Sequence, residues 1–322
     1  MKHADSIFAI AQDPMSSSRS LLYASWVRSL NRYGLDPGER GRPRSLSATE
    51  LRQAQERTGK LLHVAQSGLD GLFQAVGGAG CCVLFTDGQG IPVDRRGHCA
   101  DDATFFDWGL WTGTDWSERS EGTNGIGTCL AEKRALTIHR DQHFHTRNTG
   151  LSCTVAPIYD HLGRLAAALD VSSCRSDLAE PFLPLIAAAV ADAARKIEMR
   201  YFREAFTGAR IILAPETDLA AAALLAVNSD DVVIGATRNA RAALQLKDEN
   251  MGRLSAADLL KSRAFEPKEA LERAERRVLN WALAQSHNNV ARAARLLGVS
   301  RATMHRKIAK MRSGAASADV VD

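Results

Sequence analysis

The chain has 322 residues, of which 45% are hydrophobic and 24% are charged, and its net charge is +4. This length predicts two or three domains, and the composition is typical of a globular protein. No apolar run approaches the roughly 18 residues of a membrane span, and the N-terminus lacks the apolar core of a signal peptide, so we expect a cytoplasmic protein outside the membrane. The six cysteines include no CxxC pair and are expected to be mostly reduced thiols there.

Residues 1–46 are predicted to form an N-terminal helical segment followed by a linker. An amphipathic helix is expected from Ser18 to Tyr33, with an apolar face made by Leu21, Leu22, Trp26 and Leu30. Gly34 and Pro37 are expected to end it. Residues 38–46 are rich in Gly, Pro and Arg, which favours a linker.

Residues 47–206 have the pattern of an α+β domain. Ser47 and Glu50 have the spacing of a capping box, which predicts a long helix to about Val76. Strand patterns follow at 81–86, 91–94, 135–139, 152–159 and 165–172. A closing Ala-rich helix is expected from Asp177 to about Phe206. Cys81 and Cys82 begin a strand, so their side chains should point to opposite faces.

Residues 207–264 are predicted to form a smaller segment. Two strand patterns, at 224–228 and 232–236, are separated by a Ser-Asp-Asp turn and predict a hairpin. A short helix is expected at 238–244. A segment of about 40–50 residues is marginal for an independent core, so we expect it to pack on its neighbours or on a second subunit.

Residues 265–313 carry the most specific pattern of the chain, two helices joined by a tight turn. The first helix is expected from Val290 to Leu297. Gly298 can adopt the left-handed conformation that ends a helix, and Ser300 is a natural N-cap for the next one. Residues 314–322 are expected to be a flexible tail.

The helix after this turn has the features of a DNA-recognition helix. Met304, Ile308 and Met311 are spaced to form one buried stripe. The second helix of a helix-turn-helix enters the major groove of double-stranded DNA, where Arg and Thr side chains can contact base edges. The predicted DNA-binding residues are Ser300, Arg301, Thr303, His305, Arg306, Lys307 and Lys310.

The distribution of charge agrees with a DNA-binding segment. Residues 268–312 contain eleven Lys or Arg and three Glu, a net charge of +8, which leaves the rest of the chain at −4. Such asymmetry is typical of a phosphate-binding module. A solvated basic surface helix would explain the charge alone, but it would not explain the turn.

This C-terminal segment closely resembles the Fis-type helix-turn-helix of sigma-54-dependent transcriptional activators. The resemblance implies a preceding helix that forms a homodimer interface. Its candidate residues are Leu271, Ala274, Val278, Trp281 and Ala282, which share one helical face. The alternative is that these residues only pack on the other two helices.

The region before it resembles the sensory GAF domain of the acetoin-catabolism regulator family. The matching motifs, in order, are Trp116-Ser-Glu118, Gly122-Thr-Asn-Gly-Ile-Gly127, Gln142-His-Phe144, Ser152-Cys153, Ala156-Pro157 and Leu169-Asp170. Residues 25–36 resemble that family too, and residues 207–264 are similar to its truncated PAS-like segment. The expected architecture is therefore a GAF sensor, a short PAS-like segment and an all-α helix-turn-helix domain.

The resemblance also implies an AAA+ ATPase domain between sensor and DNA reader, and this chain departs from that pattern. Such a domain needs a Gly-x4-Gly-Lys-Ser/Thr loop to hold phosphates. The Gly59-Lys60 pair is followed by Leu61 inside a helix pattern, and too few residues precede Lys268 to form the domain. We therefore expect no ATP-driven activation of a sigma-54 polymerase.

The GAF-like motifs supply the candidates for binding a small-molecule effector. These are Trp116, Glu118, Thr123, Asn124, His143, Phe144 and Cys153. Their glycine neighbours permit close backbone approach, so one interpretation is a loop over a ligand pocket. The other is a cluster of turns that closes the fold. The aromatic residues between Phe105 and Trp116 leave the same choice, between core packing and a pocket wall.

Other chemistry is less well supported. His139, Asp141, His143, His145 and Cys153 lie close in sequence, but no pair has the spacing of a strong zinc motif, so we expect no metal and no cofactor. No base–nucleophile pair is visible, so an enzyme is not expected. The remaining alternative is an antagonist or adaptor that forms a heterodimer with a related full-length activator.

Overall fold

The computed structural model describes residues 3–12, 20–175, 180–214, 223–261, 275, 278–283, 285–286 and 289–316. The chain divides into two compact units, Met1–Ala256 and Ala257–Asp322. Among the described helices, none combines the length and apolar character needed to cross a bilayer.

The first unit is built on a five-stranded antiparallel sheet with the order β2-β1-β5-β4-β3. Its strands are β1 (Cys82–Asp87), β2 (Pro92–Arg96), β3 (Leu136–His139), β4 (Ser152–Tyr159) and β5 (Leu165–Ser173). All five agree with the predicted strands to within two residues at each end. The central strand β5 is buried on both faces, which makes it the part of the sheet best shielded from water.

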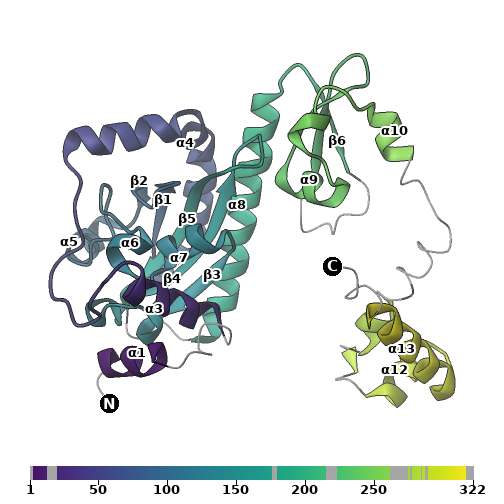
Figure 1. The fold of residues 1–322 in the computed structure, drawn as a ribbon, viewed down its shortest axis with the longest axis horizontal. Helices are drawn as coiled ribbons and strands as arrows, with labels where there is room; N and C mark the ends of the chain where they lie inside the picture. The colour runs from purple at the N-terminus through teal and green to yellow at the C-terminus, as the bar shows by residue number, and fades with distance from the viewer. Residues whose placement is uncertain are drawn as a thin grey trace. The chain divides into compact units, whose positions relative to one another are not determined.

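Two long helices cover one face of this sheet (Figure 1). The first, α4 (Ala48–Val76), begins with the predicted capping box of Ser47 and Glu50. The second, α8 (Leu183–Ala205), leads from this sheet to a smaller one. Their apolar residues, such as Leu69 and Ile197, pack on Val83, Phe85 and other residues that point to this face. Burial of this apolar surface drives the two layers together.

Short helices cover the other face of the sheet. They are α5 (Asp102–Asp107), α6 (Glu118–Glu121) and α7 (Gly125–Glu132). The apolar layer beneath them contains Cys82, while Cys81 lies in the layer under α4 and α8, so the predicted opposite orientation of the two thiols is confirmed. Neither cysteine forms a disulfide. The Gly122–Gly127 motif is not a loop throughout, because Asn124 caps the first turn of α7.

The N-terminal helices belong to this domain rather than preceding it. They are α1 (His3–Ala11) and α3 (Leu21–Asn31). Ile7 and Trp26 are buried with Phe144, and the Trp26 indole donates a hydrogen bond to the Gln142 carbonyl at 2.9 Å. The expected linker is also attached, because the Leu46 N–H donates to the Gly113 carbonyl at 2.8 Å. Residues 20–46 thus pack as part of the sensor fold.

A second sheet follows α8. It is antiparallel, with the order β6-β7-β8, and its strands are β6 (Arg210–Leu213), β7 (Leu224–Val227) and β8 (Val233–Ala236). The predicted hairpin of β7 and β8 and the helix α9 (Arg238–Leu244) are confirmed; β6 and α10 (Ala256–Lys261) were not predicted. Phe202 at the end of α8 is buried with Leu224 and Ala226, which confirms that this small segment packs on a neighbour.

The second unit contains the helix-turn-helix. Residues 278–283 are helical, and α12 (Val290–Leu296) and α13 (Arg301–Ala316) follow. Leu279, Ala282, Ala293 and Ala294 bury Met304 and Ile308, so these two positions of the predicted stripe are confirmed. The prediction of a tail from residue 314 is wrong for residues 314–316, because α13 continues to Ala316. Leu271, Ala274, the Met311 side chain and residues 317–322 lie outside what the structure describes.

Candidate functional site

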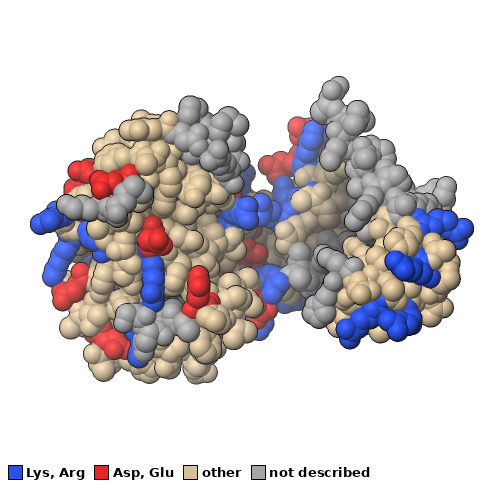
Figure 2. All heavy atoms as spheres, turned by 90° about the horizontal axis from the view of Figure 1, so that it is seen from below, with Lys and Arg blue, Asp and Glu red and all other residues tan. Residues whose placement is uncertain are grey.

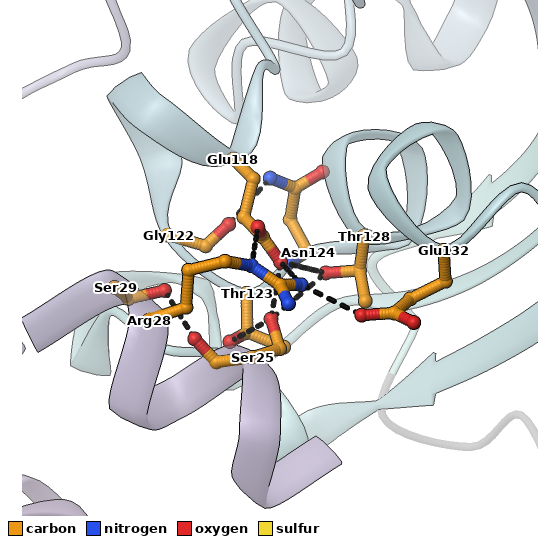
Figure 3. Close-up of polar contacts among 9 residues, drawn as sticks. All are labelled: Ser25, Arg28, Ser29, Glu118, Gly122, Thr123, Asn124, Thr128 and Glu132. Atoms are coloured by element: carbon orange, nitrogen blue, oxygen red, sulfur yellow. Dashed lines mark hydrogen bonds and ion pairs between the residues drawn. The ribbon is translucent and has the colours of Figure 1, made fainter. Parts of the chain in front are cut away.

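Buried polar side chains from α3, α6 and α7 meet in one cluster of the first unit (Figure 3). Glu118 is only 4% exposed and lies at its centre. The Ser25 hydroxyl donates to its carboxylate, and the Thr128 hydroxyl lies 3.3 Å from the same oxygen. The Ser25 hydroxyl also lies 2.7 Å from that of Thr123. Each of these groups therefore has a polar partner despite its burial.

Arg28 clamps this cluster from α3. Its guanidinium donates to both carboxylate oxygens of Glu118, at 2.5 and 2.8 Å, and to Glu132 at 2.8 Å. Hydrogen bonding to Glu118 raises the pKa of Arg28, so the guanidinium stays charged. Bidentate pairs of this kind are strong and directional. The N-terminal helix is thereby fixed to the first turn of α6 and to the end of α7.

Asn124 organises the start of α7. Its side-chain oxygen accepts from the Gly127 N–H at 2.8 Å, and its amide donates to the Gly122 carbonyl at 2.9 Å. Gly125 has no room for a side chain, because a Cβ there would lie 2.5 Å from the Cβ of Cys153. Gly125 therefore lets α7 pack directly on β4.

The seven ligand-binding candidates are all buried, but they fall into three groups. Glu118, Thr123 and Asn124 belong to the polar cluster described above. Trp116 and Cys153 lie in the apolar layer between the sheet and α7, where the Trp116 indole donates to the Gly109 carbonyl at 2.8 Å. Phe144 packs with α1 and α3 instead. Their role in ligand binding stays a prediction.

His143 joins the candidates around Cys153. Its Nδ1 lies 3.0 Å from the Arg140 carbonyl oxygen, and its Nε2 lies 3.4 Å from the Cys153 sulfur. Burial lowers the pKa of His143 to about 4 and raises the pKa of the Cys153 thiol. Both groups are therefore neutral near pH 7, with the Cys153 thiol able to donate weakly to the ring.

Several polar residues near these candidates were not predicted as site residues. Ser25 and Arg28 were hidden in a helix interpreted by its apolar stripe, and Thr128 and Glu132 lie beyond the glycine motif. Asp170 was noted only as part of a family motif. An acidic residue within a strand whose other residues are apolar or small is the signal that could have identified Asp170.

The contacts of Tyr159 connect this domain to the second sheet. The Tyr159 hydroxyl donates to the Lys133 carbonyl at the end of α7 at 2.8 Å, and the Tyr159 N–H donates to Glu198 on α8 at 2.7 Å. The Arg238 guanidinium at the start of α9 lies 4.2 Å from the centre of the Tyr159 ring. Tyr159 thus contacts α7, α8 and α9 at once.

The candidate DNA interface is formed by the turn between α12 and α13. Gly298 has a φ of +65°, the left-handed conformation predicted for it. The Thr303 N–H donates to the Ser300 hydroxyl at 3.1 Å, so Ser300 is the predicted N-cap. Asn289 caps α12 in the same way, by accepting from the Arg292 N–H at 3.1 Å.

The exposed face of α13 is basic. Arg301, His305 and Arg306 are exposed on the side away from the core, and in Figure 2 the visible face of this unit shows basic side chains among neutral ones. Lys307 is half-buried and forms an ion pair with Glu275. The side chain of Lys310 lies outside the described residues. The geometry presents the N-terminal part of α13 to an anionic partner.

Comparison with known families agrees with both geometries. Residues 60–200 match the GAF domain, and residues 270–311 match the bacterial regulatory protein Fis family. This chain carries a GAF domain joined to a Fis-family helix-turn-helix. Only residues 201–269 separate the two matches, and no ATPase domain lies between them.

Several of the similar curated proteins are named as transcriptional regulators. The acetoin catabolism regulatory protein of Cupriavidus necator is 37% identical over 234 residues, which are 71% of this chain and 35% of that protein. The acetoin dehydrogenase operon transcriptional activator AcoR of Bacillus subtilis is 29% identical over 178 residues, which are 55% of this chain and 29% of AcoR. The chain therefore spans about a third of the length of the curated relatives it matches.

A solved structure supports the fold. The E. coli DhaR(N)–DhaL complex matches with a TM-score of 0.50 and 17% identity, covering 74% of this chain and 80% of the matched chain. This likeness concerns the fold. The family matches and the curated relatives establish a transcriptional regulator with a GAF domain and a Fis-type helix-turn-helix.

Proposed function

We propose that this regulator binds double-stranded DNA through α13 and alters that binding when a small molecule occupies its GAF domain. The observation that carries the proposal is the exposed basic face of α13, which directly follows a capped tight turn on a chain that also holds a complete sensor fold. Arg301 and Arg306 are free to contact phosphates or base edges.

Ligand binding changes the DNA binding of the helix-turn-helix directly, without ATP hydrolysis. No ATPase domain lies between the GAF domain and the helix-turn-helix, so nothing at that place couples ligand binding to nucleotide turnover. A regulator of this arrangement acts by occupying a promoter, by contacting the polymerase or by pairing with another regulator.

The effector is a small molecule held by the GAF domain. One relative is named for acetoin catabolism and another for the acetoin dehydrogenase operon, which makes acetoin the first compound to test. The candidate residues Glu118, Thr123 and Asn124 lie in one buried polar cluster, which supports a site near the start of α7.

DNA binding is tested with the Arg301→Ala, Arg306→Ala double variant on DNA obtained by sequence selection. We expect about tenfold to a hundredfold weaker binding near 0.1 M salt, and a salt dependence lower by about two phosphate contacts. The control is Arg253→Ala, which removes an exposed cation from the first unit. An unchanged affinity in the double variant would rule out α13 as the DNA reader.

A second function is favoured by exposed apolar residues ahead of the helix-turn-helix. Val278 is 49% exposed and Trp281 is 54% exposed, on the helix predicted to form the dimer interface. This face supports a homodimer and equally a mixed dimer with a related activator, which the chain would then silence.

The two dimers are distinguished by sedimentation of the chain alone and after mixing with a tagged relative. Val278→Ala, Trp281→Ala should dissociate whichever dimer forms, while Leu296→Ala, at a half-exposed apolar position of α12, should not. Capture of the relative together with weak DNA binding by the chain alone would favour the silencing function. A monomer under all conditions would exclude both dimers.

A further inference from the structure

A cavity of about 700 Å³ lies between α4, α8 and the turn that joins β4 to β5. Helices α4 and α8 cover one face of the sheet, whereas the polar cluster around Glu118 lies with α6 and α7 on the other, so the two places are separate. A volume of this size is ordinary for a small-molecule site. The lining residues are Gly59, Lys60, His63, His161, Tyr201, Glu204 and Ala205.

Helix α4 is broken at Gly59, beside this cavity. Gly59 has a φ of +21° and a ψ of −102°, outside the helical range, and Figure 1 shows α4 change direction along its length. Glycine adopts such a conformation more readily than other residues. Beyond the break α4 packs closely on α8, because a Cβ at Gly68 would lie 2.9 Å from the Ile197 side chain. The cavity occupies the Gly59 end of this contact.

Aromatic rings form one wall of the cavity. The His161 ring packs edge-on against the Tyr201 ring, with centres 5.6 Å apart, and against the Phe206 ring at 5.9 Å. The Nδ1 atom of His161 is buried without a hydrogen-bond partner among the described residues. Any hydrogen bond between this ring and a molecule in the cavity is therefore made by Nε2. Tyr201 and His161 together offer ring surface as well as polar atoms.

The charges at the cavity leave a cation available. Of the two charged residues that line it, Glu204 is paired with Arg200 at 3.2 Å, and Lys60 has no ion-pair partner among the described residues. His63 is exposed three residues after Lys60, on the same side of α4. Burial, and then the nearby Asp160 carboxylate, raises the pKa of Tyr201, so its hydroxyl stays protonated. The cavity therefore presents more open donors than open acceptors.

We propose that this cavity binds a small organic anion, whose carboxylate or phosphate group accepts from Lys60 and His63 and whose body packs against Tyr201 and His161. Donors of this kind make short, strong hydrogen bonds to an anionic oxygen. The cavity is larger than the anionic group alone, which leaves room for a body the size of an aromatic ring. The site is separate from the effector candidates near α7 and does not depend on the proposed function.

Binding is measured by calorimetry on the whole chain with phenyl phosphate, benzoate and benzyl alcohol, which share a benzene ring. We expect at least one of the two anions to bind saturably and about tenfold or more tightly than the uncharged alcohol, as a hydrogen bond to a charged group provides. The anion that binds more tightly identifies the headgroup. No saturable binding of either anion at up to about 10 mM would overturn the proposal.

Two substitutions with opposite expected effects test the residues of the site. Lys60→Gln should weaken binding of the tighter anion about tenfold, because it removes the open cation. Glu204→Gln should strengthen it about twofold to fivefold, because it removes a negative charge from the lining and releases Arg200. The control is Arg119→Gln, which removes an exposed cation from α6 on the other face of the sheet and should change nothing. Equal losses in Lys60→Gln and Arg119→Gln would show that net charge, not this cavity, attracts the anion.

Modification of histidines by diethyl pyrocarbonate locates the bound anion. His63 is exposed at the cavity, and His98, which is exposed after β2, is the internal reference. The tighter anion should slow modification of His63 and leave that of His98 unchanged. Equal modification of His63 with and without a bound anion would place that anion elsewhere and overturn the assignment, whereas the DNA-binding test would be unaffected.

Discussion

At the scale of single residues, the sensor depends on how buried charges are compensated. Glu118 is held by Arg28 and by hydroxyl groups, so its burial is matched by several partners. Asp170 has one hydrogen-bond partner among the described residues, for two oxygens. The first arrangement fixes the fold, whereas the second leaves one buried oxygen without a partner in that part of the chain. The two arrangements should therefore contribute differently to the free energy of unfolding.

Replacing Arg28 by Leu should lower the free energy of unfolding by about 3 kcal/mol, because it leaves the Glu118 carboxylate buried without its cation. Urea denaturation measures this loss. The matched control is Arg42→Leu, since the Arg42–Asp107 pair is about two-thirds exposed on both sides and should contribute under about 1 kcal/mol. Equal effects from the two substitutions would contradict the clamp.

Asp170 should make stability fall as pH rises. Its pKa in the folded chain, about 7, lies above its ordinary value of 3.8, so the folded state binds a proton that the unfolded state has released. The stabilisation is complete below the ordinary value and is lost as pH rises to about 7, at up to about 1.4 kcal/mol per pH unit. Glu198 titrates in the same direction, so the comparison must be between the wild type and Asp170→Asn.

The measurement is the difference in unfolding free energy between these two proteins from about pH 5 to about pH 7. Glu198 is common to both and cancels. The wild type should lose stability relative to the variant across this window. A constant difference would show that Asp170 is not buried in a protonated form.

At the scale of elements, the position of α7 depends on the absence of a side chain at Gly125 in its first turn. Gly125 lies against β4 so closely that a Cβ would approach Cys153 and Val155 to under 3 Å. The helix can therefore sit on the sheet only if this position has no side chain. The cap by Asn124 then sets where the helix begins.

Gly125→Ala should destabilise the chain by about 1–3 kcal/mol through overpacking. Gly71→Ala, in the exposed part of α4, meets nothing within 4 Å and should instead be neutral or stabilise by up to about 1 kcal/mol. Thermal and urea unfolding of the two variants decide the matter. Similar shifts in both would mean that helix propensity, not contact with β4, governs Gly125.

At the scale of the whole molecule, charge is divided between the parts of the chain. Residues 268–312 carry +8 and the remainder −4. The basic helix-turn-helix segment is attracted to DNA, whereas the rest of the chain, which is acidic, is repelled by it. Within the reader, Glu275 pairs with Lys307 and removes one cation from the surface available to phosphates.

Glu275→Gln should therefore tighten DNA binding at low salt and steepen its salt dependence by about one phosphate contact. The control is Glu249→Gln, an exposed residue of the first unit that changes the net charge of the molecule equally. Equal gains from both would show that the overall field, rather than the release of Lys307, sets the affinity.

The sequence by itself determined the elements whose signals are local. Hydrophobic period, capping residues and turn glycines act over a few residues, so β1 to β5, the hairpin of β7 and β8, and the turn at Gly298 could be predicted. The family motifs placed the sensor and the DNA reader in order. Only the tertiary structure decided which polar residues meet, because Ser25 and Arg28 are far from Glu118 in the chain and are brought to it by packing. The polar cluster is therefore a property of the fold, in which burial requires a polar group to find a partner.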